Sequence, residues 1–162
     1  MFDRQVETLR SVVADQFDEA LRSVASYDAD GFDVRYIRDD VDELYDDGDY
    51  ERAFRTHRLE AMDRPTQDSL YAHGKLLCTY RVYEEATEIH VATTETSGVL
   101  VSVDADVGIE LFATTERIVE VLGPVHSATA SDDEPDGDSF EVDGSQTGGE
   151  GTVTPSTDAE DQ

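Results

Sequence analysis

The stretch that decides the fold is residues 76–104, LLCTYRVYEEATEIHVATTETSGVLVSVD. Apolar residues alternate with polar ones in three successive runs, which is the spacing of strands with one buried face. The residues that share a face are Leu76, Cys78, Tyr80 and Val82 in the first run, Ile89 and Val91 in the second, and Val99, Val101 and Val103 in the third. The connections, residues 84–86 and 95–98, are short enough for antiparallel hairpins. We therefore predict a mainly antiparallel sheet.

Upstream of these runs, the pattern indicates helices and one further strand. Apolar residues recur every three or four positions from Phe2 to Val24, which predicts an amphipathic helix over residues 2–26. After a turn at residues 28–31, apolar and charged residues alternate and predict a strand over residues 32–36. Asp40, with Glu43 three residues later, fits a capping box that opens a short helix through Tyr45.

Two more helices complete the pattern. Apolar and aromatic residues at helical spacing follow a break at residues 46–49 and predict a helix that ends before Pro65. Residues 66–74 are ambiguous, and we expect a helical turn that docks Leu70 and Tyr71 on the core. A last helix is expected over residues 108–122. Its inward residues are Ile109, Phe112, Ile118, Val119 and Leu122.

These elements predict an α+β fold, an α/β sandwich over residues 1–125 with about four strands and three or four helices. Residues 126–162 contain 11 acidic side chains, no lysine or arginine, and few apolar side chains. Burial there cannot offset an ordering cost of about 1–2 kcal/mol per residue, so we predict a disordered acidic tail. No apolar run approaches the roughly 20 residues that span a bilayer, so no membrane contact is expected.

The charge balance predicts the environment of the protein. Asp and Glu number 39 against 12 Lys and Arg, for a formal charge of -27, and Lys75 is the only lysine. Such a surface repels itself in dilute buffer, whereas at 1 M salt the Debye length falls to about 3 Å and screens the repulsion. We therefore predict a halophilic, cytoplasmic protein that holds bulk hydrated K⁺ at its surface. The lone Cys78 excludes an internal disulfide and any zinc site built from several cysteines.

Two segments carry a resemblance to a known group of proteins. The strand that runs into Tyr36–Ile37–Arg38–Asp39–Asp40, and the β-rich block that ends in Gly98–Val99–Leu100–Val101–Ser102–Val103–Asp104, resemble small uncharacterised domain proteins of haloarchaea. The resemblance covers about residues 1–125 and implies a source and a fold but no activity. The order of elements is also similar to the roadblock and profilin-like sandwiches, which implies a dimerising scaffold by fold analogy alone.

Catalytic and metal-binding motifs are absent from the sequence. It has no phosphate loop, no nucleophile elbow and no His-x-x-x-His or Cys-x-x-Cys pair, so we expect no cofactor and no metal. Cys78 and His90 are predicted to lie on opposite faces of the sheet, which argues against a thiol nucleophile with a histidine base. The aspartates at residues 28–33 and 46–49 match a calcium loop poorly and are interpreted as acidic turns.

One cationic cluster opposes the overall charge. Arg52, Arg55 and Arg58 are spaced by three on the second long helix, with His57 between them. They fit either a set of exposed ion pairs, each worth about 0–1 kcal/mol, or a contact with an anion or an acidic partner. No catalytic residue is predicted, and these four are the candidate binding residues.

These observations favour a non-enzymatic module for protein interaction or signalling, as a homodimer or with another cytosolic protein. The alternative is a small-ligand or anion sensor, or a minor enzyme, with a pocket between the sheet and the 50–62 helix. That pocket would be lined by Tyr50, Phe54, His57 and Arg58. A second alternative is a transcription-associated helix-turn-helix over residues 41–62, although nucleic acid is not the expected partner because salt weakens phosphate contacts steeply.

The charge balance predicts how stability depends on salt. We expect the melting temperature to rise as KCl increases towards molar concentrations, because screening removes the repulsion among carboxylates. Circular dichroism during heating, at a series of KCl concentrations, measures this dependence. A protein that stays fully folded and equally stable in millimolar buffer would contradict the halophilic interpretation.

Overall fold

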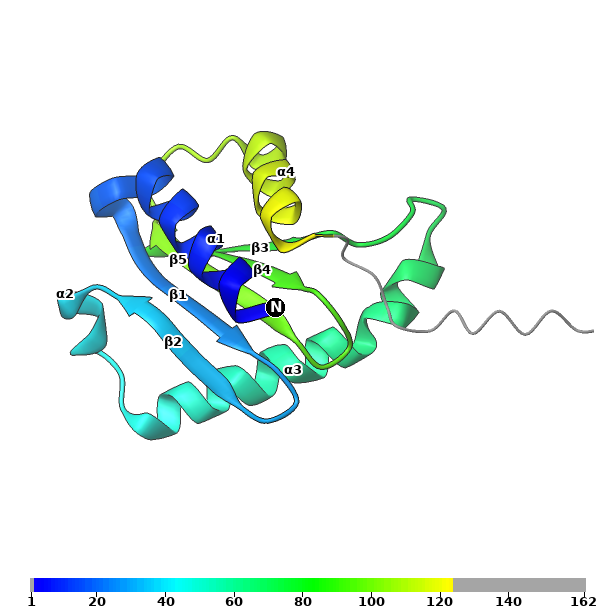
Figure 1. Ribbon diagram of the computed structural model, residues 1–162, viewed down its shortest axis with the longest axis horizontal. Coiled ribbons are helices and arrows are strands. Elements are labelled where there is room, and N and C mark those ends of the chain that lie inside the picture. The colour runs from blue at the N-terminus through cyan, green and yellow to red at the C-terminus, as the bar shows by residue number, and fades with distance from the viewer. Residues whose placement is uncertain (1, 124–162) are drawn as a thin grey trace, which may run out of the picture. The chain divides into compact units, whose positions relative to one another are not determined.

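The computed structural model describes residues 2–123, so the predicted tail at 126–162 lies outside the described residues. Figure 1 shows the elements in chain order. They are α1 (Phe2–Phe17), the 3-10 turn η1 (Asp18–Ala20), β1 (Leu21–Tyr27), β2 (Phe32–Ile37), α2 (Asp39–Asp42), α3 (Asp47–Leu70), β3 (Thr79–Val82), β4 (Ala86–Ala92), β5 (Gly98–Asp104) and α4 (Leu111–Leu122).

A five-stranded sheet in the order β2-β1-β5-β4-β3 forms the middle layer of residues 2–123. Every neighbouring pair is antiparallel, and β3, β4 and β5 follow one another as hairpins. In Figure 1, α1 and α4 cover one face of the sheet and α3 crosses the other. The α+β class and the antiparallel sheet are thus confirmed, with five strands where about four were expected.

The additional strand is β1, which the sequence pattern assigned to the first helix. The helix predicted over residues 2–26 ends at Phe17, and Asp18 turns the chain with a φ of 48°. Leu21 pairs with Val103 and Ser23 with Ser102, so Arg22 is an extra residue in a β-bulge. Because of this bulge, the core residues Leu21 and Val24 are three positions apart, a spacing that imitates a helix.

The main core lies between the sheet and the pair α1 and α4. The predicted faces of the second and third runs are confirmed, because each of their members is at most 1% exposed: Ile89, Val91, Val99, Val101 and Val103. The first run is only partly correct: Cys78 and Tyr80 pack on this core, but Val82 is 78% exposed and Leu76 precedes β3. On α4, residues Thr114, Ile118 and Leu122 define the buried face. Phe112 is 82% exposed, so its predicted inward position is wrong. It precedes Thr114 by two residues, a rotation of about 200° around the helix.

Helix α3 begins earlier and ends later than predicted. Asp46 caps it, accepting a hydrogen bond from the amide of Asp49, while the Asp49 side chain accepts one from the amide of Asp46. The helix continues through Pro65, which lacks the amide hydrogen of a helical bond, and Arg64 anchors this turn by donating to the carbonyls of Ala92 and Leu76.

The segment after Pro65 also differs from the prediction. Residues 66–70 are the last turn of α3, and neither apolar side chain of this region docks on the core. Leu70 is 62% exposed and Tyr71 is 66% exposed. Ala61 and Arg64 define the buried side of the helix, and the next position on that side is the polar residue Asp68. Leu70 lies off this side, and Tyr71 follows the end of the helix.

An ionic cluster ties the ends of three strands together. Nη1 and Nη2 of Arg38 donate to the Asp104 carboxylate, at 2.9 and 3.0 Å, and Arg22 donates to the same carboxylate at 3.1 Å. Arg38 also pairs with Asp40. Asp40 lies inside α2 and forms no cap, so the predicted capping role of Asp40 is wrong. The hydrogen bond from Arg38 lowers the pKa of Asp104 below 3.8, against the opposing effect of burial.

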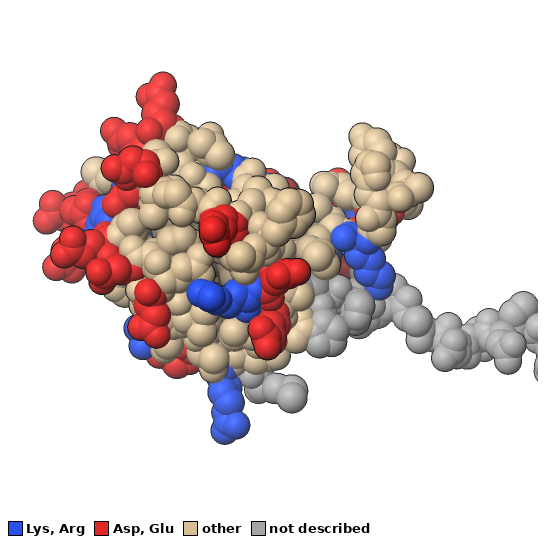
Figure 2. Space-filling view, turned by 90° about the horizontal axis from the view of Figure 1, so that it is seen from above, with Lys and Arg blue, Asp and Glu red and all other residues tan. Residues whose placement is uncertain are grey.

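Aspartates in the turns also serve the backbone. The Asp28 carboxylate accepts hydrogen bonds from the amides of Asp30 and Gly31, which closes the β1–β2 hairpin. The acidic turns at residues 28–33 and 46–49 therefore have local structural roles. Figure 2 shows Asp and Glu side chains gathered at one end of the face viewed from above, with few Lys and Arg among them.

The Arg38–Asp104–Arg22 cluster predicts a pH-dependent contribution to stability. Asp104→Asn should lower the free energy of unfolding at pH 7 by about 1–3 kcal/mol, since charged hydrogen bonds become neutral ones. Because the folded-state pKa of Asp104 is lowered, its contribution is complete above about 3.8 and is lost as the pH falls below that value. The difference in the free energy of unfolding between wild type and Asp104→Asn should therefore become smaller towards pH 3.

Urea denaturation in molar KCl at pH 7 and near pH 3 measures that difference. Asp15→Asn is the matched control, because it removes the same formal charge from an exposed position of α1. A difference for Asp104→Asn that is no larger than the difference for the control would show that the cluster contributes nothing.

A close approach at the start of β5 predicts a requirement for glycine. A Cβ atom at Gly98 would lie 2.7 Å from the Val91 carbonyl oxygen and 2.7 Å from Cζ of Tyr27. Gly98→Ala should therefore lower the free energy of unfolding by about 1–3 kcal/mol. Gly108→Ala, where nothing lies within 4 Å of the added atom, should change it by less than about 0.5 kcal/mol. Equal effects of the two substitutions in urea denaturation would contradict the proposed steric role of Gly98.

Candidate functional site

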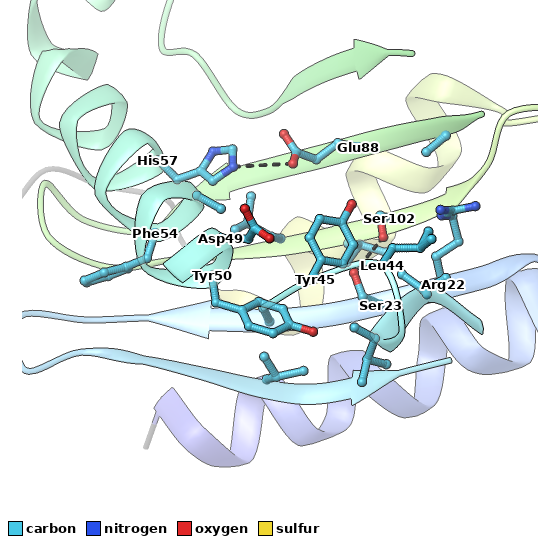
Figure 3. Close-up of a pocket in the computed structure, with 18 of the residues that line it drawn as sticks. Arg22, Ser23, Leu44, Tyr45, Asp49, Tyr50, Phe54, His57, Glu88 and Ser102 are labelled. Carbon is cyan, nitrogen blue, oxygen red and sulfur yellow. Dashed lines mark hydrogen bonds and ion pairs between the residues drawn. The ribbon is translucent and has the colours of Figure 1, made fainter. Parts of the chain in front are cut away.

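The face of the sheet opposite to α1 and α4 bounds a cavity of about 630 Å³ beneath α2 and α3. A volume of 300–1,000 Å³ is typical of sites for small molecules. Figure 3 shows side chains from both layers around it, with Ser23 and Ser102 on the sheet and Tyr45, Tyr50 and Phe54 on the helical side.

Small side chains on the sheet create the space. Ser23 and Ala25 of β1 and Ser102 of β5 line the cavity, and the hydroxyl groups of Ser23 and Ser102 lie 2.6 Å apart. β2 has a second bulge, in which Arg35 is the extra residue. Val34 and Tyr36 would share a face in a regular strand, but because of the bulge Tyr36 packs on the main core while Val34 lines the cavity. The bulges therefore divide the side chains of β1 and β2 between the core and the cavity.

Aromatic rings form another part of the lining, with Phe32 on β2 and Tyr45, Tyr50 and Phe54 on the helical side. Phe32 stacks on Tyr50 and on Phe54, with ring centroids 5.9 and 5.8 Å apart, and Tyr45 lies 5.7 Å from Tyr50. The hydroxyl group of Tyr50 donates to Asp42 at 2.8 Å, and burial together with that carboxylate raises the pKa of Tyr50 to about 12. The rings thus offer flat apolar surfaces, and Tyr50 adds a neutral hydroxyl group.

One end of the cavity meets a group of buried and half-buried ionisable side chains, which we call the polar cluster: Tyr27, His57, Glu60, Arg81, Glu88 and His90. Nδ1 of His57 lies 3.3 Å from Glu60 Oε2, and Nε2 of the same ring lies 3.4 Å from Glu88 Oε2. Figure 3 shows the His57–Glu88 contact at the edge of the cavity. Arg81 contacts both carboxylates.

The second histidine of the polar cluster is equally enclosed. His90 is 5% exposed and His57 is 6% exposed, and their ring centroids lie 5.1 Å apart. Nε2 of His90 lies 2.7 Å from the Tyr27 hydroxyl group, and Nδ1 lies 3.5 Å from Glu60 Oε2. All the buried side-chain polar atoms of the described residues have a hydrogen-bond partner.

Burial and charge set the protonation states in the polar cluster. Burial, together with the neighbouring His57 and Arg81, lowers the pKa of His90 to about 3, so its imidazole is neutral. Burial alone would raise the pKa of Glu88, but hydrogen bonds and charge from His57 and Arg81 outweigh it, and that pKa is lowered. Burial raises the pKa of Tyr27 above its ordinary range. At neutral pH, the neutral imidazole of His90 therefore lies in a cluster that also holds an ionised Glu88 and the Arg81 guanidinium.

The position of α3 explains why the sequence did not reveal the polar cluster. The buried residues of this helix are His57, Ala61 and Arg64, so its inner face carries more polar than apolar groups. Leu59 and Met62, which suggest a core-facing helix in the sequence, are exposed. His57, Ala61 and Arg64 recur at helical spacing and could have indicated the inner face of the helix. Polar residues at this spacing are usually exposed, however, so the sequence alone does not identify them as buried.

The structure separates the four predicted binding residues. His57 faces the sheet, whereas Arg52 and Arg55 are exposed, and Arg58 is half-buried. Arg52 pairs with Asp49 on the same helix. Of the residues predicted to line a pocket, Tyr50, Phe54 and His57 do so, and Arg58 does not belong to the lining. Whether the arginines contact an anion or an acidic partner stays a prediction.

Cys78 and His90 lie on opposite faces of the sheet, as predicted. Cys78 packs against the main core, whereas His90 lies in the polar cluster beneath α3. Burial raises the pKa of the Cys78 thiol to about 11, so the thiolate needed for nucleophilic attack is scarce at neutral pH. The pair does not form a nucleophile with its base.

The arrangement as a whole suits binding. An apolar, partly aromatic cavity joins a set of fixed hydrogen-bonding groups at one end, which is the usual composition of a ligand site. Within residues 2–123, the groups whose ligand atoms come close enough to hold a metal ion are His57, Glu60 and His90. The acids and bases of the polar cluster are paired with one another.

Comparison with known proteins identifies a family without assigning a role. None of the helices in the described part of the chain has the length and apolar character needed to cross a bilayer. No curated protein matches the sequence. The model of a domain of unknown function, DUF7522, matches residues 7–123, from α1 to the end of α4. The chain therefore belongs to the DUF7522 family, which agrees with the resemblance to uncharacterised domain proteins.

Proposed function

We propose that this domain is a non-enzymatic module that binds a small molecule between the sheet and helices α2 and α3. The cavity of about 630 Å³ carries the proposal. Three small side chains, Ser23, Ala25 and Ser102, hold this space open in a sheet whose other face is tightly packed with valine and isoleucine. Protein interiors rarely leave such volumes unfilled, because empty space forfeits dispersion contacts.

The lining indicates the chemistry of the ligand. The rings of Phe32, Tyr50 and Phe54 suit a flat, mostly apolar body. The Ser23 and Ser102 hydroxyl groups and the His57–Glu88 pair offer hydrogen bonds to its polar groups. The charged lining residues are Arg22, Asp49, Glu84, Glu85 and Glu88, and Arg22 is already paired with Asp104. This balance favours a neutral or cationic ligand over an anion.

The same location offers a route to signalling. Val41, Leu44 and Tyr45 line the cavity from α2 and the segment before α3, and Leu44 is 63% exposed. A ligand beneath them would bury apolar surface at about 25 cal/mol per Å² and hold this segment in place. A protein partner could then recognise the ordered α2–α3 segment of the ligand-bound protein and distinguish it from the same segment in the ligand-free protein.

The other predicted functions differ in their support. A homodimer, or a contact with another protein, stays a prediction, for which β2 and β3 provide the two edges of the sheet. Binding of DNA through residues 41–62 gains no support, because α2 has four residues and the first turn of α3 carries Asp47 and Asp49, which repel phosphate.

Nile red tests the cavity, because this dye is flat, uncharged and fluorescent in apolar surroundings. In molar KCl, the wild-type protein should bind about one equivalent with a blue-shifted emission. Ala25→Phe places a ring in the cavity from β1 and should reduce the dye affinity at least tenfold while the fold, measured by circular dichroism, is retained.

Two controls define the result. Ala72→Phe adds the same ring at an exposed position after α3 and should leave dye binding unchanged. Arg55→Gln combined with Arg58→Gln should also leave it unchanged, because neither residue lines the cavity. The absence of dye binding by the wild type, or equal binding by Ala25→Phe, would refute the proposal.

A further inference from the structure

We propose that His57, Glu60 and His90 form a binding site for a transition-metal dication, with Zn²⁺ as the best match. The residues come from α3 and β4, and their ligand atoms all lie within 4.8 Å of one another. Two imidazoles and one carboxylate are a donor set that zinc prefers over the all-oxygen sets of Mg²⁺ and Ca²⁺. The metal site shares His57 with the lining of the cavity, but it rests on its own donor geometry and does not require the small molecule proposed there.

The distances suit tetrahedral coordination. Zinc lies about 2.0–2.1 Å from its nitrogen and oxygen ligands, so two tetrahedral ligands are about 3.3 Å apart. Glu60 Oε2 lies 3.3 Å from Nδ1 of His57 and 3.5 Å from Nδ1 of His90. The carboxylate oxygen is therefore correctly spaced from both rings. Closure of the site requires the ligand nitrogens of the two imidazoles, which lie within 4.8 Å of each other, to be about 3.3 Å apart.

The outer nitrogen of each ring is also held as metal sites require. Ligating histidines usually donate their second ring N–H to a carboxylate or another oxygen, which orients the ring and fixes its tautomer. Nε2 of His57 lies 3.4 Å from Glu88 Oε2, and Nε2 of His90 lies 2.7 Å from the Tyr27 hydroxyl group. Both Nδ1 atoms thus face Glu60, and the Arg81 guanidinium also approaches Nδ1 of His57.

Arg81 is the cation that competes with the metal. Its guanidinium contacts Glu60 Oε2 and lies 3.4 Å from Nδ1 of His57, so it neutralises the atoms that a zinc ion would bind. Arg81 comes from the short edge strand β3, and its side chain is partly exposed. It can therefore turn away from Glu60 and keep its contact with Glu88, which leaves the site to the dication.

Titration with Zn²⁺ and Co²⁺, in molar KCl with excess Mg²⁺ to occupy surface carboxylates, tests the site. Isothermal calorimetry should give one Zn²⁺ per chain. His57→Gln and His90→Gln should each reduce the affinity at least tenfold, and Glu88→Gln should reduce it about tenfold through the lost outer hydrogen bond. Arg81→Gln should raise the affinity, because it removes the competing charge.

His73→Gln is the matched control, because it removes an exposed imidazole that stacks on Tyr71, outside the polar cluster. Co²⁺ adds a readout that a merely structural role would not give, since four-coordinate cobalt with nitrogen ligands absorbs visible light far more strongly than six-coordinate cobalt on surface carboxylates. Should His57→Gln or His90→Gln fail to fold, the Co²⁺ spectra of wild type and Arg81→Gln decide the question. The absence of the four-coordinate spectrum from both, or loss of binding only with His73→Gln, would overturn the proposal.

Discussion

Strand β1 packs against helices on both faces of the sheet, and its bulge at Arg22 determines which side chains point to each face. Leu21 and Val24 enter the core beneath α1 and α4, while Ser23, Ala25 and Tyr27 face α3. A strand without the bulge would send Leu21 and Ser23 to the same face, because the side-chain period of a strand is two. The bulge thus creates both the complete apolar core and the open second face.

The two faces of the sheet obey different physical rules. On the α1 and α4 side, β-branched residues fill the space, and the stability comes from apolar burial at about 25 cal/mol per Å². On the α3 side, the helix presents His57, Ala61 and Arg64, and small residues of the sheet leave a cavity. Buried polar groups cost free energy unless they are paired, so the contacts among Arg81, Glu60 and Glu88 are a condition for this face to exist.

Packing a helix on a sheet through polar side chains contributes little to the free energy of unfolding, since well-packed apolar residues in the same place often give equal or greater stability. The described residues already possess an apolar core, so stability alone does not require His57 and His90 beneath α3. Local breaks in regular patterning are typical of functional sites, where structure is maintained at the expense of stability. The cavity and the polar cluster are the places where this chain departs most from a simple sandwich.

The sequence by itself determined the antiparallel hairpins within residues 76–104, the strand at 32–36, the α+β class and the opposite orientation of Cys78 and His90, because period-two alternation is a local property. It also indicated that Tyr50, Phe54 and His57 share a side of one helix. Tertiary structure alone decided that residues 21–27 form a strand, that α3 passes Pro65, and that His57 meets His90 and Glu60. Bulges and long-range contacts are set by the partner strand and by packing, and neither leaves a periodic signal in the chain.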